Sequence, residues 1–336
     1  MKKILVAIAA TVSLSACGGG DGDPFNTNPD PDPTPTPSTR EMPPGTENPT
    51  PNSDILRREP RNTGDRLGDG YAQSVTYNAD TDVFTVDNIA FDGNNSYTRD
   101  SDVPNLGPFA VYEAPLTEPD RFDGALINQY GHRAIYGEST SGNTRFAIVR
   151  TGNYLNYGFG GFVYQRDGGV TLPTTGQAAY RGTLAGIRDP NGAGDLQYTT
   201  ADVNIQIDFD DFNDSTGSRG DAVRGVINNR RIFDSRTGAD ITQSVLAAHG
   251  AGLTAIPGAA FSVGPGVIDD NGEILGEISS SYTDADGNVV AFETGNYYAI
   301  VSGDNADEIV GVVVLESTLP IDGVAARETG GFIVYN

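Results

Sequence analysis

Turn-forming residues recur roughly every ten positions from about residue 70 onward, and this rhythm restricts the fold more than any other feature. Between the turns lie short segments in which apolar and polar residues alternate, as they do in half-buried strands. The chain also holds 43 glycines, 15 tyrosines and 14 phenylalanines, a composition typical of strands and turns. The sequence therefore predicts an all-β protein.

The strand candidates form two groups, separated by a composition shift near residues 168–175. The first group comprises 74–77, 83–86, 89–91, 109–113, 134–137, 145–150 and 159–165; the second comprises 178–185, 201–209, 222–227, 258–263, 273–282, 289–292, 297–301, 309–316 and 331–335. Only 241–248 has helical spacing. The second group suits an eight-stranded antiparallel β-barrel, whose interior side chains fill. Function is then expected on loops and outer faces.

The N-terminus carries a targeting signal. Lys2 and Lys3 precede a short apolar stretch, 4–14, and the tetrapeptide LSAC ends at Cys17, the only cysteine of the chain. This pattern resembles a bacterial lipoprotein lipobox, in which the cysteine becomes the lipidated N-terminus. We therefore predict a signal peptide over 1–16 and lipidation of Cys17, against the alternative of a secreted protein with a chance cysteine.

Residues 17–65 read as a tether. Glycine, proline, threonine and aspartate dominate it, and apolar residues are almost absent, so disorder with a polyproline bias is expected. Such a spacer holds a domain away from the membrane to which it is anchored. Gly18 stands where an aspartate would signal inner-membrane retention in enteric bacteria, which favours the outer membrane.

The charge of the chain excludes some partners. The net charge is −24, and without Lys2 and Lys3, the only lysines, 19 arginines face 45 acidic residues, a net charge of −26. Nucleic acid and anionic lipid headgroups both require a basic face, so neither is an expected partner. The acidity itself is explained by solubility or by a salt-adapted proteome.

Several short motifs carry a family resemblance. They are GQAAYRGTLAG at 176–186, the segments 201–209 and 223–227, NGEILG at 271–276 and GDNADEIVG at 303–311. In order and spacing these motifs resemble the β-barrel domain of transferrin-binding protein B and related surface lipoproteins. The chain departs from the family pattern at Leu184, often a tryptophan, at Asp304, usually a proline, and at Val310, usually a glycine.

The resemblance implies an architecture and a role. Residues 66–170 would form a small β-rich handle domain and 171–336 the barrel, in an outer-membrane lipoprotein displayed at the cell surface with the help of export machinery. The family implies a non-catalytic protein that captures a protein or iron-bearing ligand, such as an iron carrier, with no cofactor. Recognition lies in variable loops, so the ligand-binding residues stay unknown. The alternative is a passive, acidic envelope lipoprotein without a specific ligand.

Two acidic segments resemble calcium sites. DFDDFND at 208–214 offers dense carboxylates, and DADGN at 284–288 resembles the start of an EF-hand loop. The first lacks the full ligand spacing, and the second has Gly295 where the loop requires glutamate. A solvated strand end and a hairpin turn, respectively, are the favoured interpretations, and no metal site is predicted.

The remaining candidates also favour structural roles. His132 and His249 lie in different predicted domains, so a shared catalytic or metal site, and with it a hydrolase, is disfavoured. Four rings could form an adhesive face, although packing of alternate rings in the handle core is favoured. These rings belong to Tyr154, Tyr157, Phe159 and Phe162.

Overall fold

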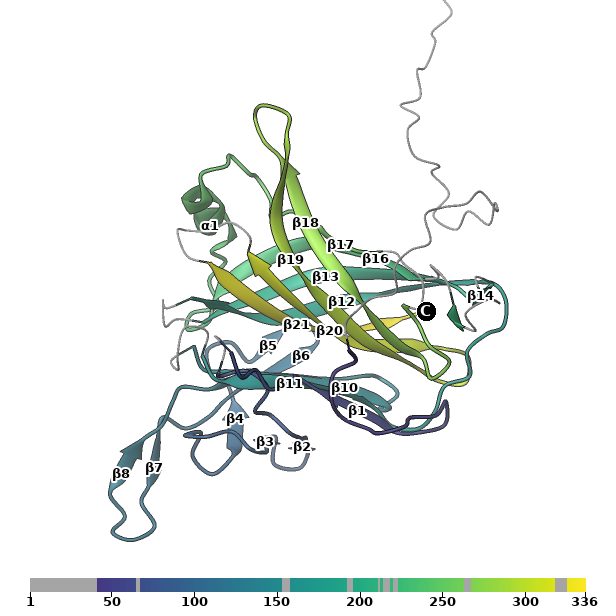
Figure 1. The fold of residues 1–336 in the computed structure, drawn as a ribbon. Helices are drawn as coiled ribbons and strands as arrows, with labels where there is room; N and C mark the ends of the chain where they lie inside the picture. The colour runs from purple at the N-terminus through teal and green to yellow at the C-terminus, as the bar shows by residue number, and fades with distance from the viewer. Residues whose placement is uncertain are drawn as a thin grey trace, which may run out of the picture.

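The protein consists of a closed barrel and a second, curled sheet that lies against one side of it (Figure 1). The computed structural model describes residues 41–64, 67–152, 158–191, 196–210, 212–213, 218–219, 223–262, 267–317 and 325–336. The predicted all-β class and eight-stranded antiparallel barrel are confirmed. Cys17 lies outside the described residues. Within them, no helix combines the length and apolarity needed to cross a membrane.

Eight strands close the barrel, because the last one pairs with the first. They are β12 (Gln177–Pro190), β13 (Gln197–Asp208), β16 (Val223–Asp234), β17 (Ala259–Phe261), β18 (Glu273–Thr283), β19 (Val289–Ser302), β20 (Glu308–Ser317) and β21 (Ala326–Tyr335). The helix α1 (Thr242–His249) follows β16, near the predicted position. The prediction of two strands at 289–292 and 297–301 is wrong. β19 runs through the polar residues between them because they pair with β20.

Apolar side chains fill the barrel, as predicted. The rings of Phe261 and Tyr297 stack there with their centroids 3.9 Å apart. Gly225 and Gly276 make room for them, since a Cβ atom at either position would lie within 2.7 Å of one of the rings. Missing side chains on two strands thus accommodate large ones on their neighbours.

The handle sheet has the strand order β1-β11-β10-β9-β6-β4-β3-β2, with β5 paired to β6. Its strands are β1 (Ile55–Arg58), β2 (Val75–Asn78), β3 (Val83–Val86), β4 (Ser96–Arg99), β5 (Asn105–Leu106), β6 (Phe109–Glu113), β9 (Arg133–Glu138), β10 (Thr144–Arg150) and β11 (Gly160–Arg166). Two hairpins lie outside both sheets, β7 (Thr117–Pro119) with β8 (Leu126–Asn128), and β14 (Phe212–Asn213) with β15 (Ser218–Arg219). The strand predicted at 89–91 is wrong, because Phe91 adopts a left-handed conformation with φ 58° in a loop.

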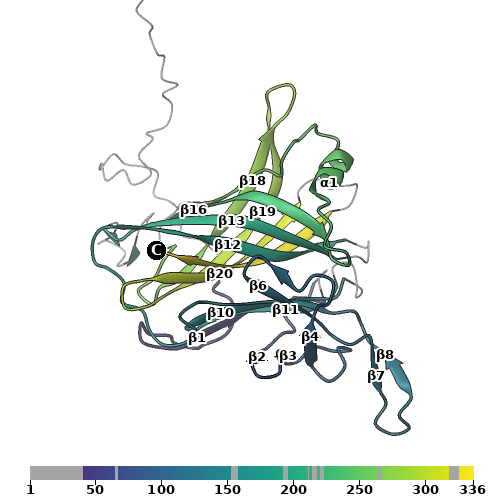
Figure 2. The same cartoon turned by 180° about the vertical axis from the view of Figure 1, so that it is seen from behind.

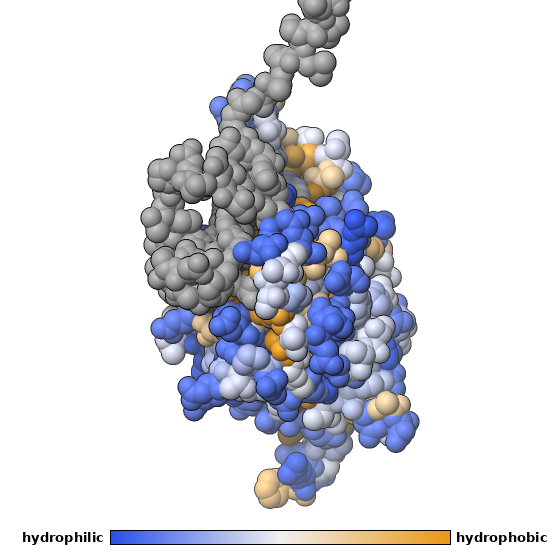
Figure 3. All heavy atoms as spheres, turned by 90° about the vertical axis from the view of Figure 1, so that its right-hand side faces the viewer, coloured by the Kyte–Doolittle hydropathy of each residue, from blue (hydrophilic) through white to orange (hydrophobic). Residues whose placement is uncertain are grey.

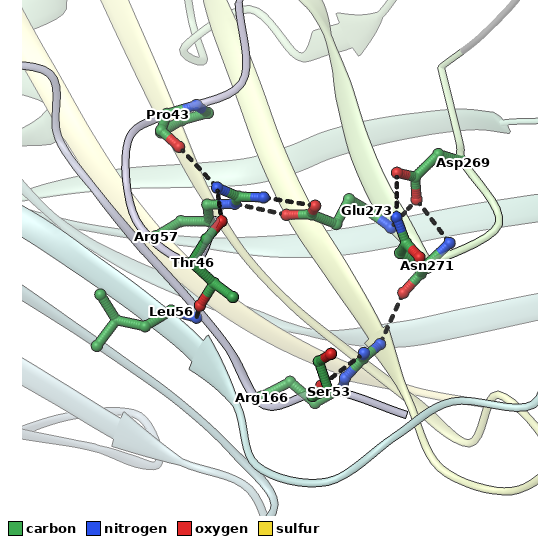
Figure 4. A network of polar contacts seen from close by, with 9 residues as sticks. All are labelled: Pro43, Thr46, Ser53, Leu56, Arg57, Arg166, Asp269, Asn271 and Glu273. Carbon is green, nitrogen blue, oxygen red and sulfur yellow. Dashed lines mark hydrogen bonds and ion pairs between the residues drawn. The ribbon is translucent and has the colours of Figure 1, made fainter. Parts of the chain in front are cut away.

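The segment 41–58, which we call the strap, corrects the predicted tether. Disorder was expected through residue 65, but β1 pairs with β11 and the strap reaches the barrel. Arg57 donates from Nε and Nη2 to the two carboxylate oxygens of Glu273, both at 2.6 Å (Figure 4). Composition did not reveal this order because long-range polar contacts supply much of it, and only two apolar residues of the strap, Ile55 and Leu56, pack in the cores.

Arg166 joins the strap, the handle and the barrel. Its buried guanidinium donates to five main-chain carbonyls, those of Pro51, Ser53, Gly168, Asn271 and Val301, at 2.8 to 3.3 Å. Figure 4 shows this side chain below the Arg57–Glu273 pair. A planar group with five donors can hold three separate segments at once, which a lysine could not do.

The handle and the barrel share an apolar core. One face of β9, β10 and β11 packs against the outer wall of β19, β20 and β21. Phe146 lies at the centre of this contact, directly opposite Gly137 in the β9–β10 ladder and against Gly331 of the barrel. The other face of the handle sheet packs on its own curled end, β2–β4.

Candidate functional site

Among the described residues, the carboxylates of the two acidic segments accept hydrogen bonds from main-chain amides in nearby turns. The prediction of a solvated strand end is wrong for Asp208, which is buried and accepts hydrogen bonds from the side chain of Gln177 and the amide of Asp210. Asp211 and Asp214 lie outside the described residues. Asp284 accepts bonds from the amides of Asp286 and Asn288 within the β18–β19 hairpin, and these bonds lower the pKa of its carboxyl. The hairpin-turn interpretation of 284–288 is confirmed.

The two histidines are not brought together. His132 is fully buried in the handle among the rings of Tyr97, Tyr130 and Phe159, and burial lowers its pKa to about 4. His249 ends α1 on the barrel side, where it contacts aromatic rings of the β18–β19 hairpin. Both therefore act as packing residues in this arrangement.

The aromatic candidates divide in the same way. Phe159 packs in the core of the curled handle, with its ring centroid 4.2 Å from that of Tyr71. Phe162 packs in the core between the handle and the barrel. Packing in the core is therefore confirmed for these two rings. Tyr154 and Tyr157 lie outside the described residues.

A cluster of buried charges crosses the junction between the handle and the barrel. Arg150 of β10 pairs with Glu59 and Asp69, both at 2.7 Å, and Arg327 of β21 pairs with the same two carboxylates. Burial disfavours the charged form of Glu59, but the two arginines outweigh it and lower its pKa. Asp189 of β12 is also buried here. This junction fixes how the handle sits on the barrel.

The β7–β8 hairpin is the most exposed apolar feature among the described residues. Phe122, at its turn, is 99% exposed, and Leu116, Leu126 and Ile127 are 67%, 69% and 45% exposed. Figures 1 and 2 show the hairpin projecting from the end of the handle that lies away from β1. Exposed apolar residues in such a cluster are typical of interaction sites.

The turn that carries Phe122 is well ordered. Asp120 accepts hydrogen bonds from the amides of Phe122 and Gly124, and its own amide donates to the carbonyl of Ala125. Asp123 accepts a further bond from the amide of Ala125. The two aspartates therefore fix the backbone of the turn on which the exposed ring of Phe122 stands.

The base of the hairpin is anchored on a second loop. The amide of Tyr130 donates to the carbonyl of Phe91, and their rings are 5.3 Å apart in an edge-on arrangement. Gln129 accepts a bond from the amide of Gly93. An exposed ring, Phe91, thus extends the apolar surface from the hairpin onto the handle.

A groove of about 480 Å³ lies between the handle and the barrel wall. Leu106 and Val103 line it from the handle, and Thr183 and Phe233 line it from the barrel. On the face in Figure 3, hydrophilic residues predominate among those described, with some apolar residues between them. The groove and the hairpin are two apolar features of the described surface.

Sequence reasoning did not identify the hairpin or the junction charges. The hairpin had a signal, since Asp123-Gly124 is a turn dipeptide placed between Leu116 and Leu126. The junction had none, because Glu59, Arg150 and Arg327 are far apart in the sequence and only the fold brings them together.

No family model and no curated protein matches the chain. Solved structures do resemble it. A double mutant of transferrin-binding protein B from Haemophilus parasuis is 14% identical, with a TM-score of 0.39, over 84% of this chain and 45% of that one. The isotype 1 protein from serogroup B Neisseria meningitidis is 13% identical, with a TM-score of 0.33, over 79% and 41%.

A third structure, titled a surface lipoprotein, is 11% identical, with a TM-score of 0.29, over 69% of this chain and 99% of that one. The chain spans less than half the length of the two transferrin-binding proteins. A curled sheet followed by a closed eight-stranded barrel, the architecture that the family resemblance implies, is present in this chain.

Proposed function

We propose that this chain is an outer-membrane lipoprotein, displayed at the cell surface, that captures a protein or iron-bearing ligand and catalyses no reaction. The observation that carries the proposal is the β7–β8 hairpin, in which an ordered turn presents Phe122 entirely to solvent. A large exposed ring is costly to solubility unless a partner covers it. Aromatic side chains of this kind are typical anchors at the centre of protein interfaces.

The charge around the hairpin defines the partner further. Glu118, Asp120 and Asp123 surround the apolar residues, and Arg121 is the one basic residue between Thr117 and Asn128. The complementary surface is an apolar pocket with a basic rim, which fits a protein ligand better than an anionic membrane. Lipidation of Cys17 would supply the attachment that an acidic chain cannot obtain from lipid headgroups.

The rigid placement of the hairpin supports capture over a passive coat. A coat protein requires no ordered apolar projection, whereas a capture protein gains affinity when its anchor residues are held in position before binding. The passive acidic lipoprotein is the alternative that the experiment must separate from capture.

The test has a localisation arm and a binding arm. Protease treatment of intact cells should remove the protein, whereas protection until the outer membrane is opened would contradict surface display. For binding, the full-length lipoprotein in detergent is immobilised and exposed to a panel of iron-loaded carrier proteins. The wild type should retain at least one of them at physiological salt.

Two variants make the binding arm specific. The double variant Phe122→Ser with Leu126→Ser should abolish retention, whereas Val289→Ser, which removes an exposed apolar residue from a barrel hairpin, should leave it unchanged. Equal losses in both variants would indicate nonspecific adhesion and refute the site. Failure of the wild type to retain any carrier would favour the passive lipoprotein.

A further inference from the structure

One buried carboxylate at the junction, that of Asp189, takes part in none of the ion pairs described above. Asp189 is 3% exposed, and neither of its side-chain oxygens has a hydrogen-bond partner among the described residues. Buried polar atoms nearly always have partners, so this orphan requires an explanation. Its surroundings are tight, because a Cβ atom on Gly158 would lie 2.8 Å from Oδ2 of Asp189.

The charges that face Asp189 come from both parts of the molecule. From the barrel, Arg327 stands directly opposite it in the β12–β21 ladder, and Glu316 stands opposite Arg327 in the next ladder. From the handle come Arg150, Glu59 and Asp69, which bind one another and Arg327. With Asp189 ionised, three carboxylates share the two guanidinium groups that Glu59 and Asp69 already occupy.

We propose that Asp189 is a proton-controlled latch between the handle and the barrel. When it is protonated, Arg327 is committed to Glu59 and Asp69 of the handle, and the two parts are held together. When it loses its proton, a buried negative charge without a hydrogen-bond partner is added beside Glu59 and Asp69, and the junction loosens because opening it hydrates this carboxylate. The handle carries the β7–β8 hairpin, so the state of the latch also sets how firmly that hairpin is positioned.

The direction of the pH dependence follows from the burial of Asp189. Burial raises the pKa of this carboxyl to about 7, against the opposing effect of Arg150 and Arg327, from an ordinary value of 3.8. Between these two values the closed junction holds a proton that an opened junction releases. The closed state is therefore most favoured at low pH and loses that advantage as the pH rises through about 7.

Hydrogen exchange measured by mass spectrometry on the full-length protein in detergent tests the latch. After correction for the intrinsic exchange rate, protection of β1, β10 and β21 in the wild type should fall about thirtyfold between about pH 5.5 and about pH 8.5. Asp189→Asn, which keeps the shape of the protonated acid, should hold protection high at both pH values. Asp202→Asn, an exposed control on the neighbouring strand β13, should behave like the wild type.

Three results would overturn the proposal. They are equal protection of the wild type at both pH values, the same pH dependence in Asp189→Asn, and loss of the pH dependence in Asp202→Asn. If Asp189→Asn fails to fold, a carbon-13 titration of the wild-type Asp189 carboxyl decides the question. A pKa within about one unit of its ordinary aspartate value of about 3.9 would rule the latch out.

Discussion

Adding one methyl group at Gly331 should destabilise the contact between the handle and the barrel. A Cβ atom at this position would lie 2.1 Å from Cδ2 and 2.2 Å from Cε2 of Phe146. The ring cannot retreat, because a Cβ atom on Gly137 would already be 2.4 Å from its far edge and Phe109 packs edge-on at a centroid distance of 4.9 Å. Overpacking usually costs about 1–3 kcal/mol, and a ring enclosed on three sides places Gly331→Ala near the upper end, about 3 kcal/mol.

A double-mutant cycle isolates the cause. Phe146→Leu alone should cost about 1–2 kcal/mol, since it shortens a buried side chain. Combined with Gly331→Ala, it should recover about 1–2 kcal/mol, because the shorter side chain leaves room for the new methyl group. Gly330→Ala is the matched control. Its methyl group would contact Leu184 inside the barrel, so it should show no coupling with Phe146.

Urea unfolding followed by circular dichroism measures six proteins, namely the wild type, the three single variants, and Phe146→Leu combined with either Gly331→Ala or Gly330→Ala. Tryptophan fluorescence is excluded because the chain has no tryptophan. The expected order of midpoints is wild type, Phe146→Leu, the double variant, and then Gly331→Ala. If the costs of Phe146→Leu and Gly331→Ala simply add, the clash between these two residues is not what holds the junction in register, and the reasoning fails.

Three further predictions concern other parts of the chain. Burial lowers the pKa of His132 to about 4, so between about pH 6.5 and about pH 4 the unfolded chain binds a proton that the folded chain excludes. The free energy of unfolding should therefore fall by up to about 3 kcal/mol over this range. His132→Phe should flatten this pH dependence, measured by the midpoints of urea unfolding. Arg57→Ala should lower the free energy of unfolding by about 3–5 kcal/mol, because it leaves the buried Glu273 unpaired. Arg231→Ala, at an exposed ion pair, should lower it by at most about 1 kcal/mol. Equal losses in the two variants would contradict the role of the strap. Cys17→Ser should abolish incorporation of radiolabelled fatty acid and release the protein from membranes, and retention of the label would contradict lipidation.

The barrel was predictable because its strands alternate regularly. In β13, Val203, Ile205 and Ile207 all face the interior, and polar residues separate them. The strap was not predictable, because β1 lies in a proline-rich segment and is tied down by Arg57 and Arg166, whose partners in the barrel lie more than 100 residues away. The alternation of apolar and polar residues shows which face of a strand is buried. No local sequence pattern shows which distant residue forms an ion pair.

The same limit applies to the candidate site. The apolar hairpin has a turn dipeptide that sequence reasoning can recognise, but nothing local shows that Phe122 points to solvent and not into a core. Asp189 reads as an ordinary polar residue near a strand end. Only the closed barrel and the docked handle turn it into a buried carboxylate without a partner.

The strap also determines how the fold bears mechanical load. Any pull on the N-terminal end enters the described structure at residues 41–58, and β1 passes it to β11 along the strand direction, so that all the ladder hydrogen bonds are sheared together. Arg57 and Arg166 then divide the force between the barrel and the handle. Under such a load the strap, the handle sheet and the barrel would therefore move as one body.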